Sequence, residues 1–291
     1  MKLSKYISAL LDILIVSCLL VFFSSYGFND SRNQGWYVQT FPYLDSCNIT
    51  SFAFLDSLKG FAVTNQNPHV HSYILKTTNG GDNWAIINST YPNFNKIQFA
   101  DKNTGYASAY TNYLWKTTDG GDTWFTLTYG GLFYPQDMAV INKDTVLFVM
   151  DAGLGGGVFR TTDGGNTFAR IWGNSGTGMP YSIYMYNKYL GFQLYSGPTS
   201  YDMRRTSDGG FTWTNITGEQ YVCIQMLDSL TGWKGYAGIK KTTDGGLTWI
   251  SQQVPIFTYN SIRSISILNK DTVWLSVHIF MVEVIYLMLP F

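Results

Sequence analysis

The sequence has little charge and almost no glutamate. Charged residues make up 13% of its 291 residues, 19 Lys and Arg balance 19 Asp and Glu, and Glu219 and Glu283 are the glutamates. Because Glu, Lys and Arg are strong helix formers, their scarcity excludes a helical bundle. Zero net charge also excludes a protein held to nucleic acid mainly by charge, which needs a basic excess to displace counterions.

Aromatic residues and glycine are abundant instead. The chain has 21 Tyr, 19 Phe, 9 Trp and 29 Gly, and 45% of its residues are hydrophobic. Aromatic side chains favour β-strands, and glycine favours the tight turns between strands. The hydrophobic content is ample for a folded core, which excludes wholesale disorder.

The N-terminus has the pattern of a secretory signal. Lys2 and Lys5 precede an apolar run over residues 13–23, which is too short to span a bilayer as a helix but suits a signal-peptide core. Ser25-Tyr26-Gly27 then gives a small-x-small cleavage pattern. We therefore predict a signal peptide over residues 1–27 and a secreted, periplasmic or cell-surface protein. An uncleaved membrane anchor is the alternative, and no other membrane contact is expected.

Two cysteines, Cys47 and Cys223, remain in the predicted mature chain. A disulfide between them is permitted outside the cytosol. Two small buried hydrophobic residues are the alternative interpretation.

A nine-residue segment occurs five times in the chain. Each copy has a Lys or Arg, two hydroxyl residues, Asp-Gly-Gly or Asn-Gly-Gly, and a closing aromatic residue. The copies span residues 76–84, 116–124, 160–168, 205–213 and 241–249, and recur every 36 to 45 residues. Their acidic or amide positions are Asn79, Asp119, Asp163, Asp208 and Asp244, and their closing aromatics are Trp84, Trp124, Phe168, Trp213 and Trp249.

The chemistry of this segment is that of a turn. Asp-Gly-Gly between two β-rich runs predicts a hairpin, because glycine adopts positive φ without steric cost. The short Asp side chain can accept backbone N–H groups of its own turn, and the aromatic residue can cover the turn. We therefore assign these residues structural roles.

A second pattern precedes the turns. Phe54-Leu-Asp56-Ser-Leu-Lys-Gly60 matches Phe99-Ala-Asp101-Lys-Asn-Thr-Gly105 and, more loosely, segments in the later units. Each unit thus contains strand A, a polar hairpin, strand B, a variable loop, strand C, the Asp-Gly-Gly turn and strand D. Four short antiparallel strands per ~40–45 residues form the blade of a β-propeller.

These hairpins resemble those of the Asp-box, or bacterial neuraminidase repeat, propellers. The paired motifs are most similar to photosystem II assembly and stability factor propellers and their secreted bacterial relatives, over roughly residues 36 to 277. The resemblance implies a propeller scaffold whose functional residues lie opposite the Asp boxes, in the B–C and D–A loops.

The repeats predict a single propeller domain over residues 28–291 with six blades. Residues 36–40 read as an orphan strand D, and they would complete a last blade with strands A and B at 264–268 and 272–277. Strand C would come from residues 282–287. Because no further Asp-Gly-Gly follows, a truncated seven-bladed ring is the alternative.

Candidate catalytic residues are few. The resemblance implies that a sialidase would need three substrate-binding Arg and a Tyr–Glu pair, but between the signal segment and the tail Glu219 is the only Glu. Another glycosidase needs two carboxylates about 5–10 Å apart. Besides Glu219, the loops opposite the turns hold Asp137, Asp151 and Asp202, which are candidates by location.

Tyrosines in the same loops are candidate ligand contacts, and they are Tyr134, Tyr181, Tyr195, Tyr201 and Tyr221. Such residues can bind a protein or a glycan, or they can pack between blades. His69 and His71 have no apparent third partner, so we expect no metal and no cofactor. We predict a monomeric, non-catalytic scaffold that binds a protein or carbohydrate partner. The alternative is a carbohydrate-active hydrolase that uses loop carboxylates.

Overall fold

The computed structural model describes residues 39, 41–44, 47–65, 71–90, 93–129, 134–151, 156–173, 179–196, 201–216, 218–236, 238–253, 261–279 and 282–288. The chain divides into two units, Met1–Thr40 and Phe41–Phe291, and every described strand lies in the second. The predicted signal peptide at residues 1–27 lies outside the described residues. Among those that are described, no helix is long and apolar enough to span a membrane.

The described strands form six antiparallel sheets. The first blade contains β1 (Asn48–Phe54), β2 (Gly60–Asn65), β3 (Ser72–Thr77) and β4 (Ala85–Thr90). The second contains β5 (Phe94–Phe99), β6 (Gly105–Ala109), β7 (Tyr113–Thr117) and β8 (Phe125–Thr128). The third contains β9 (Tyr134–Val140), β10 (Val146–Asp151), β11 (Gly157–Thr161) and β12 (Ala169–Trp172).

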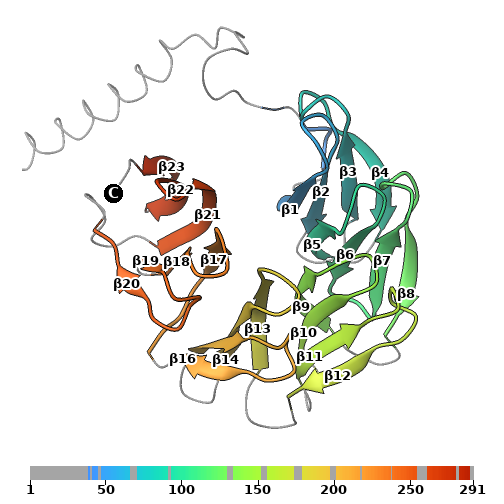
Figure 1. Cartoon of the computed structure of the whole chain (residues 1–291). Helices are drawn as coiled ribbons and strands as arrows, with labels where there is room; N and C mark the ends of the chain where they lie inside the picture. The colour runs from blue at the N-terminus through green and yellow to red at the C-terminus, as the bar shows by residue number, and fades with distance from the viewer. Residues whose placement is uncertain are drawn as a thin grey trace, which may run out of the picture. The chain divides into compact units, whose positions relative to one another are not determined.

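The fourth blade contains β13 (Met179–Met185), β14 (Gly191–Ser196), β15 (Tyr201–Thr206) and β16 (Thr214–Ile216). The fifth contains β17 (Cys223–Met226), β18 (Gly232–Gly235), β19 (Ile239–Thr242) and β20 (Ile250–Ser251). The sixth contains β21 (Ser261–Asn269), β22 (Thr272–Ile279) and β23 (Val282–Met288). In every blade the strands pair in chain order (Figure 1).

Each blade contacts the next in the sequence. Strand β5 packs on β1 and β2, β9 on β5 and β6, β13 on β9 and β10, and β21 on β17 and β18. Between the fourth and fifth blades, the backbone N–H of Met226 donates to the Tyr184 hydroxyl at 3.0 Å. This arrangement confirms the predicted all-β propeller with six blades.

The sixth blade has three strands among the described residues. Strand β23 covers the segment expected to supply strand C, and its backbone pairs with β22 from Val273↔Met288 to Ile279↔Val282. The predicted strand D at residues 36–40 lies outside the described residues, except for Gln39, which is not in a strand. The alternative of a truncated seven-bladed ring stays a prediction.

The Asp-Gly-Gly turns are closed by threonine and aspartate side chains. In the fifth blade, Asp244 Oδ1 accepts the Thr242 hydroxyl at 2.8 Å and the Thr248 N–H at 3.0 Å, while Oδ2 accepts the Thr248 hydroxyl at 2.6 Å. The same bonds occur around Asp119, Asp163 and Asp208. In the first turn Asn79 replaces the carboxylate, and Asn83 replaces the hydroxyl residue that would donate to it.

The two hairpins join at one end in each of the first five blades. In the fifth blade Gly245 N–H donates to the Leu230 carbonyl of the A–B hairpin at 2.8 Å, and the other four turns make the same bond. Asp228 caps that A–B hairpin by accepting two backbone N–H groups. We call this the turn end of the propeller. The opposite end, with the B–C and D–A connections, is the loop end.

Four of the five turns also contact the preceding blade. The second glycine lies against a side chain of that blade, so that a Cβ built on Gly246 would lie 2.4 Å from the Phe192 ring and one on Gly121 would lie 2.3 Å from Phe61. The closing Trp249 packs edge-on to the same Phe192, with ring centroids 6.0 Å apart. The glycine therefore allows the close approach of neighbouring blades.

In the first four blades, the first residue of the nine-residue segment links the blade to the next. Arg205 Nε donates to the Gly245 carbonyl at 2.7 Å, and Lys116 Nζ donates to the Gly164 carbonyl at 2.8 Å. Arg160 makes the equivalent bond to the fourth turn, and Lys76 pairs with an acid of the second. We call these contacts the cation links.

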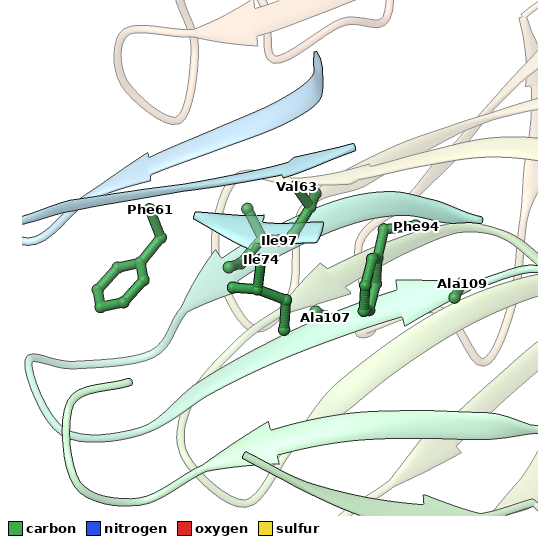
Figure 2. Packing of buried hydrophobic residues seen from close by; sticks show 7 residues of the cluster. All are labelled: Phe61, Val63, Ile74, Phe94, Ile97, Ala107 and Ala109. Carbon is green, nitrogen blue, oxygen red and sulfur yellow. The ribbon is translucent and has the colours of Figure 1, made fainter. Parts of the chain in front are cut away.

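Apolar side chains fill the space between blades. Figure 2 shows the cluster between the first and second blades, to which β2, β3, β5 and β6 contribute. Its fully buried members are Phe61, Val63, Ile74, Phe94, Ile97, Ala107 and Ala109. Packing between sheets, as well as hydrogen bonds within them, holds adjacent blades together.

The turn carboxylates predict a specific loss of stability in acid. Burial alone would raise the pKa of Asp244, but hydrogen bonds from Thr248, Thr242 and Leu247 outweigh it and lower the pKa to about 2. A carboxyl whose pKa is lower when folded stabilises the fold above pH ~4 and loses this effect as the pH falls. Asp244→Ala should cost about 1 kcal/mol at pH 7, a small value because solvent reaches the carboxylate.

This difference between wild type and Asp244→Ala should shrink between pH 4 and about 2, measured by urea unfolding. Asp271→Ala is the control, because Asp271 is exposed and pairs only weakly with Lys270 at 4.0 Å, and it should change stability by less than about 0.5 kcal/mol. A pH-independent loss for Asp244→Ala would contradict the role of its charge.

Glycine substitutions test the close approach of blades. Gly246 has φ +85° and faces Phe192, whereas Gly218 has φ +73° and no atom within 4 Å of a built Cβ. Gly218→Ala should cost about 1 kcal/mol from backbone strain alone. Gly246→Ala should cost about 3 kcal/mol, because overpacking adds to the strain. Equal losses in urea unfolding would show that the contact with Phe192 is unimportant.

Candidate functional site

Asp137 is part of the scaffold. Its Oδ1 pairs with Lys96 Nζ of the second blade at 2.6 Å. Its Oδ2 accepts the Ser182 hydroxyl at 3.0 Å and the Ile183 N–H at 2.9 Å, both from the fourth blade. One carboxylate thus connects three blades, and both oxygens are occupied. This explains the presence of an acid here without catalysis.

Asp151 and Asp202 lie on different blades. Asp151 ends β10, where its backbone pairs with Tyr134, and its side chain lies outside the described structure. Asp202 is half-buried in β15, and its backbone pairs with Tyr195. Both positions are at the loop end, as expected from the strand order.

The candidate tyrosines divide into buried and exposed groups. Tyr195 and Tyr221, expected on a ligand face, are instead buried, with exposed fractions of 6% and 2%. Tyr195 lies under the Arg204 guanidinium, 3.7 Å from the ring centroid, and burial raises the pKa of Tyr221 well above its usual value. Tyr134 and Tyr181 are exposed. The side chain of Tyr201 lies outside the described structure.

The sequence analysis missed three further exposed tyrosines that lie at the B–C connections, namely Tyr110, Tyr113 and Tyr236. Tyr110 Oη donates to Gln136 Oε1 of the third blade at 3.3 Å. Partial burial, and secondarily the nearby Tyr181, raise the pKa of Tyr110. Tyr110 of the second blade thus contacts the third blade at the loop end.

A cavity of about 590 Å³ opens at the loop end of the fifth blade. We call it the blade-five cavity. Its walls come from the connection before β17, from β18 and β19, and from the residues that end β20. The lining residues are Gly218, Glu219, Gln220, Lys234, Tyr236, Gly238, Ile239, Lys240, Ser251, Gln252 and Gln253.

Three charges meet in this cavity. Glu219 Oε2 lies 2.6 Å from Lys234 Nζ, and Glu219 Oε1 lies 2.7 Å from Lys240 Nζ. The Lys234 side chain is 4% exposed, that of Glu219 15%, and that of Lys240 34%. Lys234 also donates to the Gln220 carbonyl and lies 5.6 Å from the Trp249 ring centroid. Two lysines against one glutamate give the cluster a formal charge of +1.

Burial and ion pairing shift the pKa values of Lys234 and Glu219 in opposite directions. Burial lowers the pKa of Lys234 more than its contacts with Glu219 raise it. Burial alone would raise the pKa of Glu219, but the hydrogen bonds and charges of Lys234 and Lys240 outweigh it and lower the pKa. The carboxylate therefore stays ionised between two ammonium groups.

The backbone holds Glu219 in position. The Glu219 carbonyl accepts the N–H of Met203 in β15 at 2.9 Å, and its own N–H donates to the Ile216 carbonyl at 3.3 Å. Gly218 adopts a φ of +73° that allows this turn. The backbone of this D–A connection is thus bonded to the fourth blade, while the Glu219 side chain enters the fifth.

Sequence analysis singled out Glu219 but missed both lysines. By strand register, Lys234 occupies the position of Ala62, Ala107, Phe148 and Gln193 in β2, β6, β10 and β14. A lysine in the middle of an inner strand departs from the repeat. That departure is the signal that could have revealed the site.

The structure also places the cysteines. Cys47 and Cys223 are not joined in a disulfide, and burial raises the pKa of Cys223 to about 12. His69 lies outside the described residues. Among the residues that the structure describes, no three His, Cys, Asp or Glu side chains are grouped so that they could hold a metal ion.

Comparison with known proteins identifies the fold. No protein-family model and no curated protein matches the chain. The GH74 xyloglucanase of Xanthomonas campestris is similar, with TM-score 0.60, 11% identity, and coverage of 78% of this chain and 44% of the enzyme. A chain of a nidogen/laminin complex has TM-score 0.55 and 11% identity, with coverage of 71% and 80%.

YCF48 bound to a D1 peptide matches with TM-score 0.46 and 14% identity, covering 83% of this chain and 94% of that one. At these identities the xyloglucanase and the nidogen/laminin structure support the β-propeller fold alone. The chain spans less than half of the xyloglucanase.

The charge cluster predicts an unequal cost for removing its members. Glu219→Gln leaves the buried Lys234 ammonium without a counter-charge and should cost about 3 kcal/mol. Lys234→Met removes that buried charge while Lys240 still pairs with Glu219, so it should cost about 1 kcal/mol or less. Urea unfolding at pH 7 measures both. The opposite order would show that Lys234 does not depend on Glu219.

Proposed function

We propose that the chain is an exported, non-catalytic propeller that binds a protein partner at its loop end. The observation that carries this proposal is the blade-five cavity, a polar hollow with a built charge cluster. Ligand sites are concave and contain a few well-placed polar groups. The turn end, in contrast, is filled by hairpins that bond to each other.

The exposed tyrosines of the loop end support this proposal. Tyr110, Tyr134, Tyr181 and Tyr236 present large side chains to solvent. Tyrosine is enriched at interfaces because its ring supplies apolar contact area and its hydroxyl a hydrogen bond. These side chains would extend a contact surface beyond the cavity.

The repeat hairpins add support for an assembly role. They resemble the Asp-box hairpins of assembly and stability factor propellers, and the N-terminal pattern is that of an exported protein. The similar fold found in a nidogen/laminin complex shows that this architecture occurs in a protein complex. A protein partner outside the cytosol fits these features.

The surroundings of two candidate acids favour a binding function over hydrolysis. Asp137 is occupied by Lys96 and two donors of the fourth blade, and Glu219 lies between two lysines. A general acid needs a carboxyl that holds a proton near neutral pH, whereas the two lysines lower the pKa of Glu219 and favour its charged form.

A glycosidase is the second candidate function. It would use Asp151 and Asp202, which stand at loop-end positions of neighbouring blades, and the xyloglucanase shares the propeller fold. Release of reducing ends from xyloglucan tests it directly. We expect none from the purified chain. Release that Asp202→Asn abolishes would replace the binding proposal with the hydrolase.

Cross-linking in the native host tests which end binds. We expect wild type and Leu247→Trp, an exposed change in the turn end, to cross-link the same protein. Ser251→Trp, which fills the blade-five cavity, should reduce that product at least about tenfold. Equal cross-linking by the two variants, or loss with Leu247→Trp alone, would contradict binding at the loop end.

A further inference from the structure

We propose that the blade-five cavity binds a carboxylate side chain of an acidic, extended peptide segment. This inference rests on the proposed function and names the chemistry of the partner. It follows from the charge, the donors and the strand edge that meet at this cavity.

The first reason is the unbalanced charge. Lys234 and Lys240 share one carboxylate, that of Glu219, so one positive charge is not neutralised within the cluster. Lys234 is almost fully buried, where solvent screens charge least. A second carboxylate would complete the neutralisation.

The second reason is the supply of hydrogen-bond donors. An ammonium group has three N–H donors. Lys240 uses one on Glu219, and in the described part of the chain the other two have no partner. Its side chain is 34% exposed, so a ligand can reach it. Charge-assisted bonds of this kind are the stronger hydrogen bonds in proteins.

Glu219 prepares the site for such a ligand. It holds both ammonium groups within 2.7 Å of its oxygens, and its backbone is tied to the fourth blade. The two lysine side chains are therefore positioned before a ligand arrives. Such preorganisation reduces the entropy that binding would otherwise lose.

The lining favours a peptide over a sugar. Gln220, Gln252 and Gln253 offer amide donors and acceptors that match a peptide backbone, whereas Tyr236 is the one aromatic among the described lining residues. Sugar sites commonly use several aromatic faces.

A free strand edge lies beside the cavity. Strand β20 is the outer strand of its sheet, paired only with β19 among the described strands, and its Ser251 lines the cavity. An extended peptide can add to such an edge through main-chain bonds while alternate side chains enter pockets. Exposed Ile250 on the same strand would contact an apolar residue of the peptide.

Fluorescence anisotropy with the full chain tests the inference. The probe is a fluorescein-labelled octapeptide of alternating Glu and Val, which suits an extended strand. One comparison ligand is the same peptide with Gln in place of Glu. The other is a fluorescein-labelled oligogalacturonate, a glycan that also carries carboxylates. We expect the Glu peptide to bind at least about tenfold more tightly than either.

Variants locate the binding. Lys240→Met should weaken binding of the Glu peptide at least about tenfold, and Lys240→Arg should keep it within about threefold. Ser251→Trp should abolish it by filling the cavity. Lys270→Met is the matched control, because it removes the same charge from an exposed hairpin at the turn end and should leave binding unchanged.

Three outcomes would overturn the inference: equal binding of the Gln peptide, no effect of Lys240→Met, or preference for oligogalacturonate. If the native partner still cross-links through the loop end, only the acidic-peptide assignment falls. If that cross-link is lost as well, the proposed function falls with it.

Discussion

The propeller depends on the hydrogen bonds that close each Asp-Gly-Gly turn. The Thr242 and Thr248 groups that bond to Asp244 hold two consecutive glycines at positive φ. That conformation places the second glycine against Phe192 of the previous blade and offers the first glycine's carbonyl to Arg205. A local turn thereby determines how far apart adjacent sheets lie, and its repetition builds the whole scaffold.

Because the turns make these contacts, the two ends of the propeller differ in how freely their sequence can vary. At the turn end, bonds such as Gly245 N–H to the Leu230 carbonyl recur in five blades, so the sequence there is restricted. The loop end has no such repeated bonds among its described residues, and blades differ there. Lys234 can replace the Ala107 of another blade because Glu219 and the Gln220 carbonyl satisfy its charge.

The sequence predicted the structure well where residues of one blade interact with near neighbours in the chain, and less well where two blades meet. Turn chemistry depends on neighbours within nine residues, so the hairpins and the strand order were predictable. Tyr195 is buried against Trp172 of the third blade, and the Tyr221 hydroxyl donates to the Ser182 carbonyl of the fourth. No local pattern in the sequence reveals such contacts between blades. The lysines of the blade-five cavity were missed because Glu219 reaches them across a blade boundary.

The cation links run in one direction along the chain. Each links a blade to the turn that follows, as Lys116 does to Gly164, while Lys241 of the fifth blade lies over Trp233, 4.8 Å from its ring centroid. Every middle repeat therefore carries one donor for its successor and one acceptor for its predecessor. Duplication or loss of a whole repeat leaves no donor or acceptor unmatched, so a gene with this pattern can change its number of blades one unit at a time.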